Sequence, residues 1–350
     1  MKDLFWVLLL VFGGLAASLV CLLVVVRVAG ELRRTHVEHR RDAVRRLVLT
    51  ALLGEETEAE RAIRELRTRT GAAGDQVEEQ IFAMLPKVKG DSRSVLVEVL
   101  LGRGAAGRAY RRAKARSLVR RSRGAYQLGV LGRPDAVPTL LGLLADKRFL
   151  VRRVAVRALG QIGEATAVTP LLDAVTADPT LTRDVMAAVR RIGSPAAVPL
   201  RTELAEALGG TSQTRRAALT ATGLGLLGDV PSTPLLVRAL AGPGHPGLPA
   251  AAAEALGLIG APEAVTPLVN AVLSDDPDLR VAAARALGRI SDPAAVPGLA
   301  HALDGAGHDS DRAVAAALLR LGTRGLAALE DHSSPYAAEA LAVHSVRTSA

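Results

Sequence analysis

Apolar residues recur with a helical period through most of the chain, in units that resemble one another. One unit is VAAARALGRISDPAAVPGL, from Val281 to Leu299, and close variants begin at Arg152 and Ala250. Within each unit the spacing of apolar positions predicts a helix, a tight turn and a second helix. One such unit cannot bury its apolar face alone. The pattern therefore predicts an all-α fold in which the units stack on one another.

A glycine or serine marks the turn inside each unit, and a proline usually follows six or seven residues later. Glycine ends the first helix by adopting a left-handed conformation, and proline fits the first turn of the second helix. Successive turn residues are 30 to 35 residues apart. The turn residues are Gly132, Gly163, Gly193, Gly228, Gly260, Ser291 and Gly322, and the prolines are Pro138, Pro170, Pro199, Pro234, Pro267 and Pro297.

This period and helix-turn-helix pattern resemble the HEAT repeat, in the short form typical of phycobilisome lyases. The resemblance covers residues 116–347, about six to seven units, and implies an α-solenoid with an extended binding surface. It also implies that the second helices line the concave side. Polar second-helix positions are then candidate partner-binding residues, together with His245 in a Gly/Pro-rich loop that is alternatively a tolerated insertion. These candidates are Asp173, Glu203, Arg238, His245, Asn270 and His301.

The N-terminal residues 4–26 form an uncharged apolar run of 23 residues. A helix of this length spans roughly 34 Å, which is enough to cross a bilayer. A cleaved signal peptide is the alternative, but Arg27 stands where a cleavage site requires small residues. Arginines follow the run, so the positive-inside rule predicts a single-pass protein of the inner or plasma membrane. Its N-terminus would lie outside and its solenoid in the cytoplasm.

Between this run and the array, residues 31–115 predict a basic, helical juxtamembrane region. An alternative is that its helices are degenerate repeats that cap the array. A break is expected at Gly71 to Gly74. The expected helices are His36 to Leu53, Thr57 to Arg69, Gln76 to Leu85 and Ser92 to Leu101.

The positive charge of the chain is concentrated before the array. Residues 31–124 hold 22 Lys and Arg against 13 Asp and Glu, whereas residues 125–350 hold 20 against 21. A run from 103 to 123 contains no acid. It is either a solvated helix face or a site for anionic lipid or an acidic protein; nucleic acid is disfavoured because no recognised motif accompanies it. Its cations are Arg103, Arg108, Arg111, Arg112, Lys114, Arg116, Arg120, Arg121 and Arg123.

Four arginines near the start of first helices have a structural interpretation, because aspartates lie close to some of them in sequence. Asp146 is expected to pair with Arg152, and Asp309 with Arg312. The other two arginines of this kind are Arg216 and Arg280.

The sequence offers no catalytic constellation. Cys21 is the only cysteine, and the seven histidines include none of the His-Glu dipeptides with which the HEAT-like deoxyhypusine hydroxylases hold iron. No catalytic, metal-binding or cofactor-binding residue is therefore predicted.

We expect a membrane-anchored, non-catalytic scaffold or adaptor that binds a protein partner, such as a membrane enzyme or transporter. One alternative is a lipid- or nucleic-acid-binding module acting through the basic run, and a second is a HEAT-like enzyme of the lyase type. The 39 arginines against 5 lysines suggest a GC-rich bacterial genome.

Overall fold

The computed structural model describes residues 27, 42–210, 214–242, 247–303 and 307–348. These residues form α-helices, short 3-10 turns and connecting loops, with no β-strand among them. The chain divides into two compact units, residues 1–108 and 109–350. The expected membrane helix at 4–26 lies outside the described residues.

The first unit is a set of helices around a small aliphatic core. Val48, Leu66, Ile81 and Leu96 are fully buried in it. The expected break at Gly71 to Gly74 is wrong, because Gly71, with φ of +61°, begins a helix and the chain turns at Arg69 and Thr70 instead. Its helices are residues 42–53, α2 (Glu56–Thr68), α3 (Gly71–Met84) and α4 (Gly90–Gly102), and α5 (Ala105–Ala113) crosses the boundary between the units.

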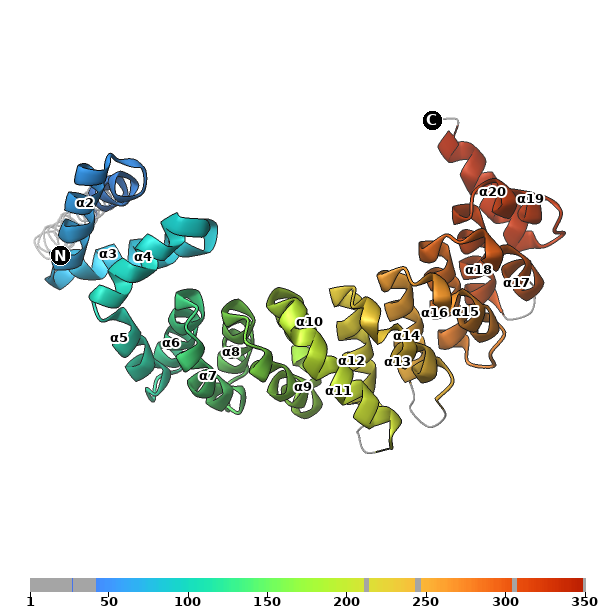
Figure 1. Cartoon of the computed structure of the whole chain (residues 1–350), viewed down its shortest axis with the longest axis horizontal. Helices are drawn as coiled ribbons and strands as arrows, with labels where there is room; N and C mark the ends of the chain where they lie inside the picture. The colour runs from blue at the N-terminus through green and yellow to red at the C-terminus, as the bar shows by residue number, and fades with distance from the viewer. Residues whose placement is uncertain (1–26, 28–41, 211–213, 243–246, 304–306, 349–350) are drawn as a thin grey trace, which may run out of the picture. The chain divides into compact units, whose positions relative to one another are not determined.

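The second unit alternates first and second helices along the chain, as the repeat predicts (Figure 1). The first helices are α6 (Leu118–Leu131), α8 (Phe149–Ile162), α10 (Thr182–Ile192), α12 (Thr214–Leu227), α14 (Leu248–Ile259), α16 (Pro277–Ile290) and α18 (His308–Arg320). The second helices are α7 (Val137–Leu144), α9 (Val168–Ala177), α11 (Ala197–Leu208), α13 (Thr233–Leu240), α15 (Val265–Val272), α17 (Val296–Ala302) and α19 (Thr323–Glu330), and α20 (Pro335–Thr348) follows.

The predicted turn residues share a positive φ, but the expected left-handed conformation is not found at all of them. Gly132, Gly163, Gly260 and Ser291 adopt it, whereas Gly193 and Gly322 combine positive φ with ψ of −146° and −145°. All six glycines have positive φ, and Ser291, with φ of 58°, is the one described non-glycine residue that shares it. A left-handed residue at this point ends the first helix and lets its last carbonyls accept bonds from the turn. The six prolines all lie in the first turn of a second helix, where a missing amide donor costs nothing.

A short 3-10 turn precedes most of the second helices, which the repeat pattern did not predict. In one of them, Asp292 accepts a hydrogen bond from the amide of Ala294 at 2.9 Å. The aspartate thereby satisfies one of the amides that a helix start leaves without a partner. Asp276 does the same for α16, accepting from the amides of Asp278 and Leu279.

Small residues bring neighbouring first helices close together. A Cβ atom placed on Gly160 would lie 2.7 Å from Cα of Ala188, and one on Gly257 would lie 2.6 Å from Cα of Ala286. Neighbouring second helices contact one another much less extensively. In Figure 1 the first helices accordingly follow the inner side of this unit's bend. The expectation that second helices line the concave side is therefore wrong, because the layer with the closer helix spacing lies on the inner side.

The regular stacking is loosest between α10 and α12. The helix α12 packs extensively on α14, but it makes limited contact with α10 and reaches α9 as well. This is the place where the spacing of turn residues stretches to 35. The irregular joint creates room for polar side chains between repeats.

Candidate functional site

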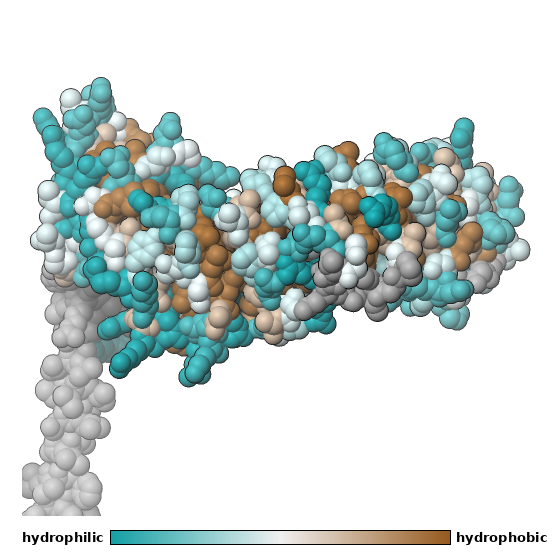
Figure 2. Space-filling view, turned by 60° about the horizontal axis from the view of Figure 1, so that its bottom comes forward, coloured by the Kyte–Doolittle hydropathy of each residue, from teal (hydrophilic) through white to brown (hydrophobic). Residues whose placement is uncertain are grey.

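Five of the predicted partner-binding residues occupy one position of the repeat, ten residues after the turn residue. Arg238 on α13, Asn270 on α15 and His301 on α17 are all exposed. They form a row at equivalent positions of three successive second helices. Figure 2 shows one face of the molecule, on which apolar residues are scattered between hydrophilic ones. The sixth candidate, His245, lies outside the described residues.

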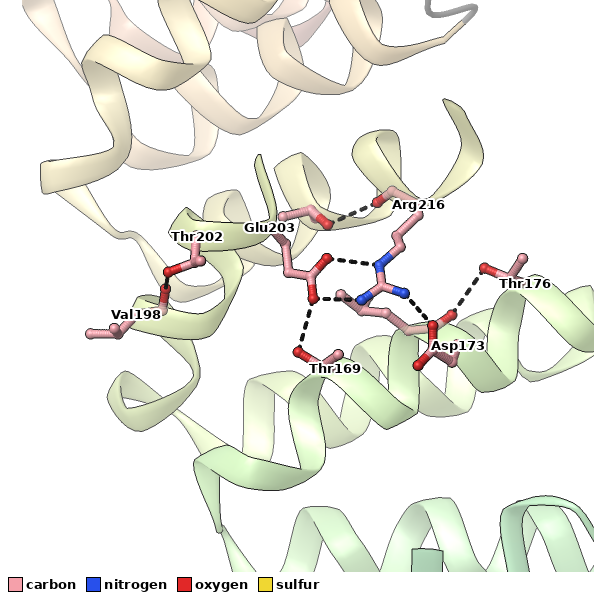
Figure 3. Close-up of polar contacts among 9 residues, drawn as sticks. Thr169, Asp173, Thr176, Val198, Thr202, Glu203 and Arg216 are labelled. Carbon is pink, nitrogen blue, oxygen red and sulfur yellow. Dashed lines mark hydrogen bonds and ion pairs between the residues drawn. The ribbon is translucent and has the colours of Figure 1, made fainter. Parts of the chain in front are cut away.

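The remaining two candidates, Asp173 and Glu203, belong to a polar cluster at the irregular joint (Figure 3). Arg216 of α12 points between α9 and α11, donating from Nε to Glu203 at 2.8 Å and from Nη1 to Asp173. Thr169 of α9 donates its hydroxyl to the other carboxylate oxygen of Glu203 at 2.9 Å. The Glu203 side chain is only 12% exposed, whereas that of Asp173 is 58% exposed. One arginine therefore ties three helices together where their packing is loosest.

Burial and bonding act against each other at Glu203. Burial raises the pKa of its carboxyl group, but hydrogen bonds from Arg216 and Thr169 outweigh that effect and hold the pKa below its usual value. The hydrogen bond to Glu203 in turn raises the pKa of Arg216. Both groups are therefore charged at neutral pH.

Part of the predicted basic run supports the fold of the first unit. The Arg103 side chain is 7% exposed and donates to the carbonyls of Leu66 at 2.7 Å and Arg69 at 2.8 Å. Glu78, itself buried, lies 3.5 Å from Arg103 and also pairs with Arg108. These two arginines hold helix ends together and are not displayed for a ligand.

In the second unit, two more cations of the run are engaged internally. Arg121 makes a two-pronged ion pair with Asp146, at 2.6 and 3.1 Å, and Arg112 donates to buried Gln127 at 2.8 Å. Burial raises the pKa of Asp146, but the hydrogen bonds from Arg121 and the Arg148 amide outweigh that effect and hold the pKa below its usual value. Five cations of the run remain exposed: Arg111, Lys114, Arg116, Arg120 and Arg123.

The helix-opening arginines form connections between repeats, although their partners differ from those expected. Arg152 donates to the backbone carbonyl of Asp146 at 2.8 Å, and its ion pair is with Asp178 at 2.6 Å. Arg312 pairs with Glu339 of α20, not with Asp309. The expected partners were the aspartates nearest in sequence, but the long arginine side chain reaches an acid in the loop or helix of the following repeat.

Charge is sorted unevenly between the two layers, which the repeat pattern did not predict. The first helices α6 to α18 carry 16 arginines and 5 acids, whereas the second helices α7 to α19 carry 3 arginines and 4 acids. Summing charge over the whole array concealed this difference, because acids in loops cancel it. A tally by repeat position would have found it.

Among the residues that the structure describes, no cluster of three or more His, Cys, Asp or Glu side chains could hold a metal ion. Within the same part of the chain, the longest apolar helices are too short to span a bilayer.

These observations define an all-helical protein built from stacked helix-turn-helix units. The family described as HEAT repeats matches residues 108–190 and 233–320, leaving out the irregular joint between them. The matched stretches together cover just under half of the chain, and HEAT repeats are what these stretches resemble. No curated protein matches the chain.

Solved structures of two HEAT-like proteins are similar to the chain. Human deoxyhypusine hydroxylase is 24% identical, with a TM-score of 0.32, over 72% of this chain and 99% of that one. The complex of CpcE and CpcF of phycocyanin lyase from Nostoc sp. PCC7120 is also 24% identical, with a TM-score of 0.32, over 67% and 92%. Likenesses this weak carry no argument for a shared activity.

They nevertheless correct one expectation. The prediction that the protein is not an enzyme is wrong as an inference from its fold, because both of these similar structures are of enzymes. A short HEAT-like array is therefore no reason to exclude catalysis.

Proposed function

We propose that this protein is a membrane-anchored scaffold or adaptor whose repeat array binds a protein partner. The observation that carries the proposal is the row of Arg238, Asn270 and His301, exposed at equivalent positions of three successive repeats. A row of this kind presents side chains at a regular spacing along a surface longer than a pocket, and that spacing suits another polypeptide.

The membrane part of the proposal rests on the apolar run at 4–26 and the arginines that follow it. An anchor would raise the concentration of the array near a membrane protein, so that weak contacts suffice for binding. A membrane enzyme or transporter is the kind of partner that this arrangement favours.

The proposal is tested by crosslinking in native membranes, affinity purification and mass spectrometry, alongside a variant that lacks residues 1–30. We expect one stoichiometric protein partner from the full chain and loss of that partner from the membrane fraction in the shortened variant. Recovery of lipid alone would contradict the scaffold function. Equal membrane association of the shortened variant would contradict the anchor.

A second candidate function is binding of anionic lipid through the five exposed cations of the run between 111 and 123. Each basic residue near an anionic membrane contributes about 1 kcal/mol of attraction. Vesicles with and without phosphatidylserine test this function, and binding that ignores the anionic lipid contradicts it. The lyase alternative has a separate test, which is bound metal or chromophore in the purified protein.

A further inference from the structure

A groove crosses three first helices, α14, α16 and α18, on the layer opposite the row of Arg238, Asn270 and His301. It encloses about 1080 Å³, slightly more than most small-molecule pockets. Its floor consists of small residues, among them Ala250, Ala282, Ala313 and Ala316. Small side chains leave space above the helix backbones, so the groove can admit a polypeptide segment.

Three arginines line the groove in the C-terminal halves of α16 and α18. Arg285 and Arg289 lie on α16, and Arg320 lies in the last turn of α18. All three side chains are exposed, and none forms an ion pair with any residue that the structure describes. The fourth arginine of the groove, Arg312, is paired with Glu339. Three positive charges are therefore available to a ligand.

Acids also line the groove, and two of the three lie at the opposite ends of these helices. Asp278 and Asp309 lie in the first turns of α16 and α18, where a negative charge stabilises the helix dipole, and Glu254 lies on α14. Because of these acids, the groove is polarised along the helices, with positive charge concentrated at one end. A uniformly charged polyphosphate chain would meet repulsion at the other end.

From this arrangement we infer that the groove binds an acidic segment of a protein partner, with carboxylates on Arg285, Arg289 and Arg320. Small or apolar residues of the segment would lie on the alanine floor. A nucleic acid fits less well, because the lining contains the three acids and no aromatic side chain on which bases could stack. The inference rests on the proposed function, since it takes the partner to be a protein.

The test uses the purified full chain and a fluorescein-labelled peptide of alternating glutamate and alanine, with binding followed by fluorescence anisotropy. A lysine–alanine peptide and a single-stranded oligonucleotide are the comparison probes. One variant combines Arg285→Glu, Arg289→Glu and Arg320→Glu. The control combines Arg183→Glu, Arg190→Glu and Arg191→Glu, which changes the net charge equally at exposed arginines of α10 outside the groove.

We expect the glutamate peptide to bind and the lysine peptide not to bind. The groove variant should lose at least about tenfold in affinity, because three exposed charge pairs with the peptide are lost together, and the control should lose less than about threefold. Thermal unfolding shows whether both variants fold. If the groove variant does not fold, a variant that combines Arg285→Gln, Arg289→Gln and Arg320→Gln replaces it. Equal losses in both variants, no binding of the glutamate peptide, or groove-dependent preference for the oligonucleotide would overturn the inference.

Photo-crosslinking in native membranes, from a crosslinker placed at one position of the chain at a time, distinguishes failure of this inference from failure of the proposed function. Position 316 lies on the groove floor and position 270 on the second-helix row. The inference predicts that an acidic segment of the partner crosslinks to position 316. A partner that crosslinks only to position 270 overturns the inference and leaves the scaffold function intact, whereas no protein at either position overturns both.

Discussion

Gly257 of α14 lies directly against the backbone of α16 at Ala286, so closely that a Cβ atom at Gly257 would stand 2.6 Å from Cα of Ala286. The same Gly–Ala contact joins α6 to α8, α8 to α10 and α12 to α14, at Gly129, Gly160 and Gly225. It is absent between α10 and α12, where the stacking loosens. The close spacing of these first helices therefore depends on glycine at each contact, because a side chain there would overlap the facing backbone.

Replacing Gly257 by valine should separate α14 from α16. The new side chain would overlap backbone, which cannot move aside as a flexible side chain can, so we expect a loss of about 2–3 kcal/mol in the free energy of unfolding. The matched control is Gly142→Ala in α7, where nothing lies within 4 Å of the added Cβ and alanine favours the helix. Urea unfolding of both variants measures the difference. Equal stability of the two would contradict the role of the Gly–Ala contact.

Replacing Arg216 by alanine should destabilise the irregular joint between α10 and α12. Glu203, only 12% exposed, would lose its cation, and we expect a cost of about 2 kcal/mol. Its exposed neighbour Arg215 makes none of the ion pairs found among the described residues, so Arg215→Ala should change stability by less than about 0.5 kcal/mol. Hydrogen exchange of α9, α11 and α12 locates the effect. If these three helices exchange hydrogen at the same rate in both variants, the cluster does not hold the joint.

The cluster should also make the array sensitive to acid. The folded-state pKa of Glu203 is lowered, so its stabilising contribution is present above its unfolded pKa of about 4.3 and is lost as the pH falls through the folded value. Between pH 7 and 3, wild type should therefore lose more stability than Glu203→Gln. The exposed Glu263→Gln variant should follow wild type. If Glu203→Gln loses as much stability as wild type, this linkage is absent.

Arg120 and Arg121 are adjacent in sequence but should behave differently on charge reversal. Arg121→Glu would place a carboxylate against Asp146, whose side chain is 9% exposed, and should cost about 3 kcal/mol. Arg120→Glu changes an exposed residue and should cost less than about 0.5 kcal/mol while weakening any attraction to anionic vesicles. Thermal unfolding and vesicle sedimentation measure the two effects. Equal unfolding temperatures would contradict the assignment of Arg121 to the fold.

The repeat positions could be predicted because backbone rules act locally. A left-handed turn residue and a proline in the first turn specify the end of one helix and the start of the next within ten residues, and Ser291 shows that the position matters more than glycine itself. The candidate site was less predictable. Asp173 and Glu203 look like exposed polar positions in the repeat, but Arg216, from one repeat beyond Glu203 and two beyond Asp173, binds both.

The basic run shows the same limit. Its nine cations are indistinguishable by composition, yet burial separates Arg103 and Arg121 from Arg111 and Arg120. What decides is whether an acid from elsewhere in the chain, Glu78 or Asp146, lies within reach, and sequence spacing does not reveal that. The difference in charge between first and second helices was missed for a related reason. The net charge of the whole array combines two sets of helices that face opposite sides.

The most direct test of the scaffold function is photo-crosslinking from position 270 in native membranes, with exposed position 263 as the control. The scaffold function predicts one stoichiometric protein joined through position 270 and much less of it through position 263. If position 270 captures no protein above the yield of position 263, the second-helix row is not a partner-binding surface, and if position 316 captures none either, the proposed function is contradicted.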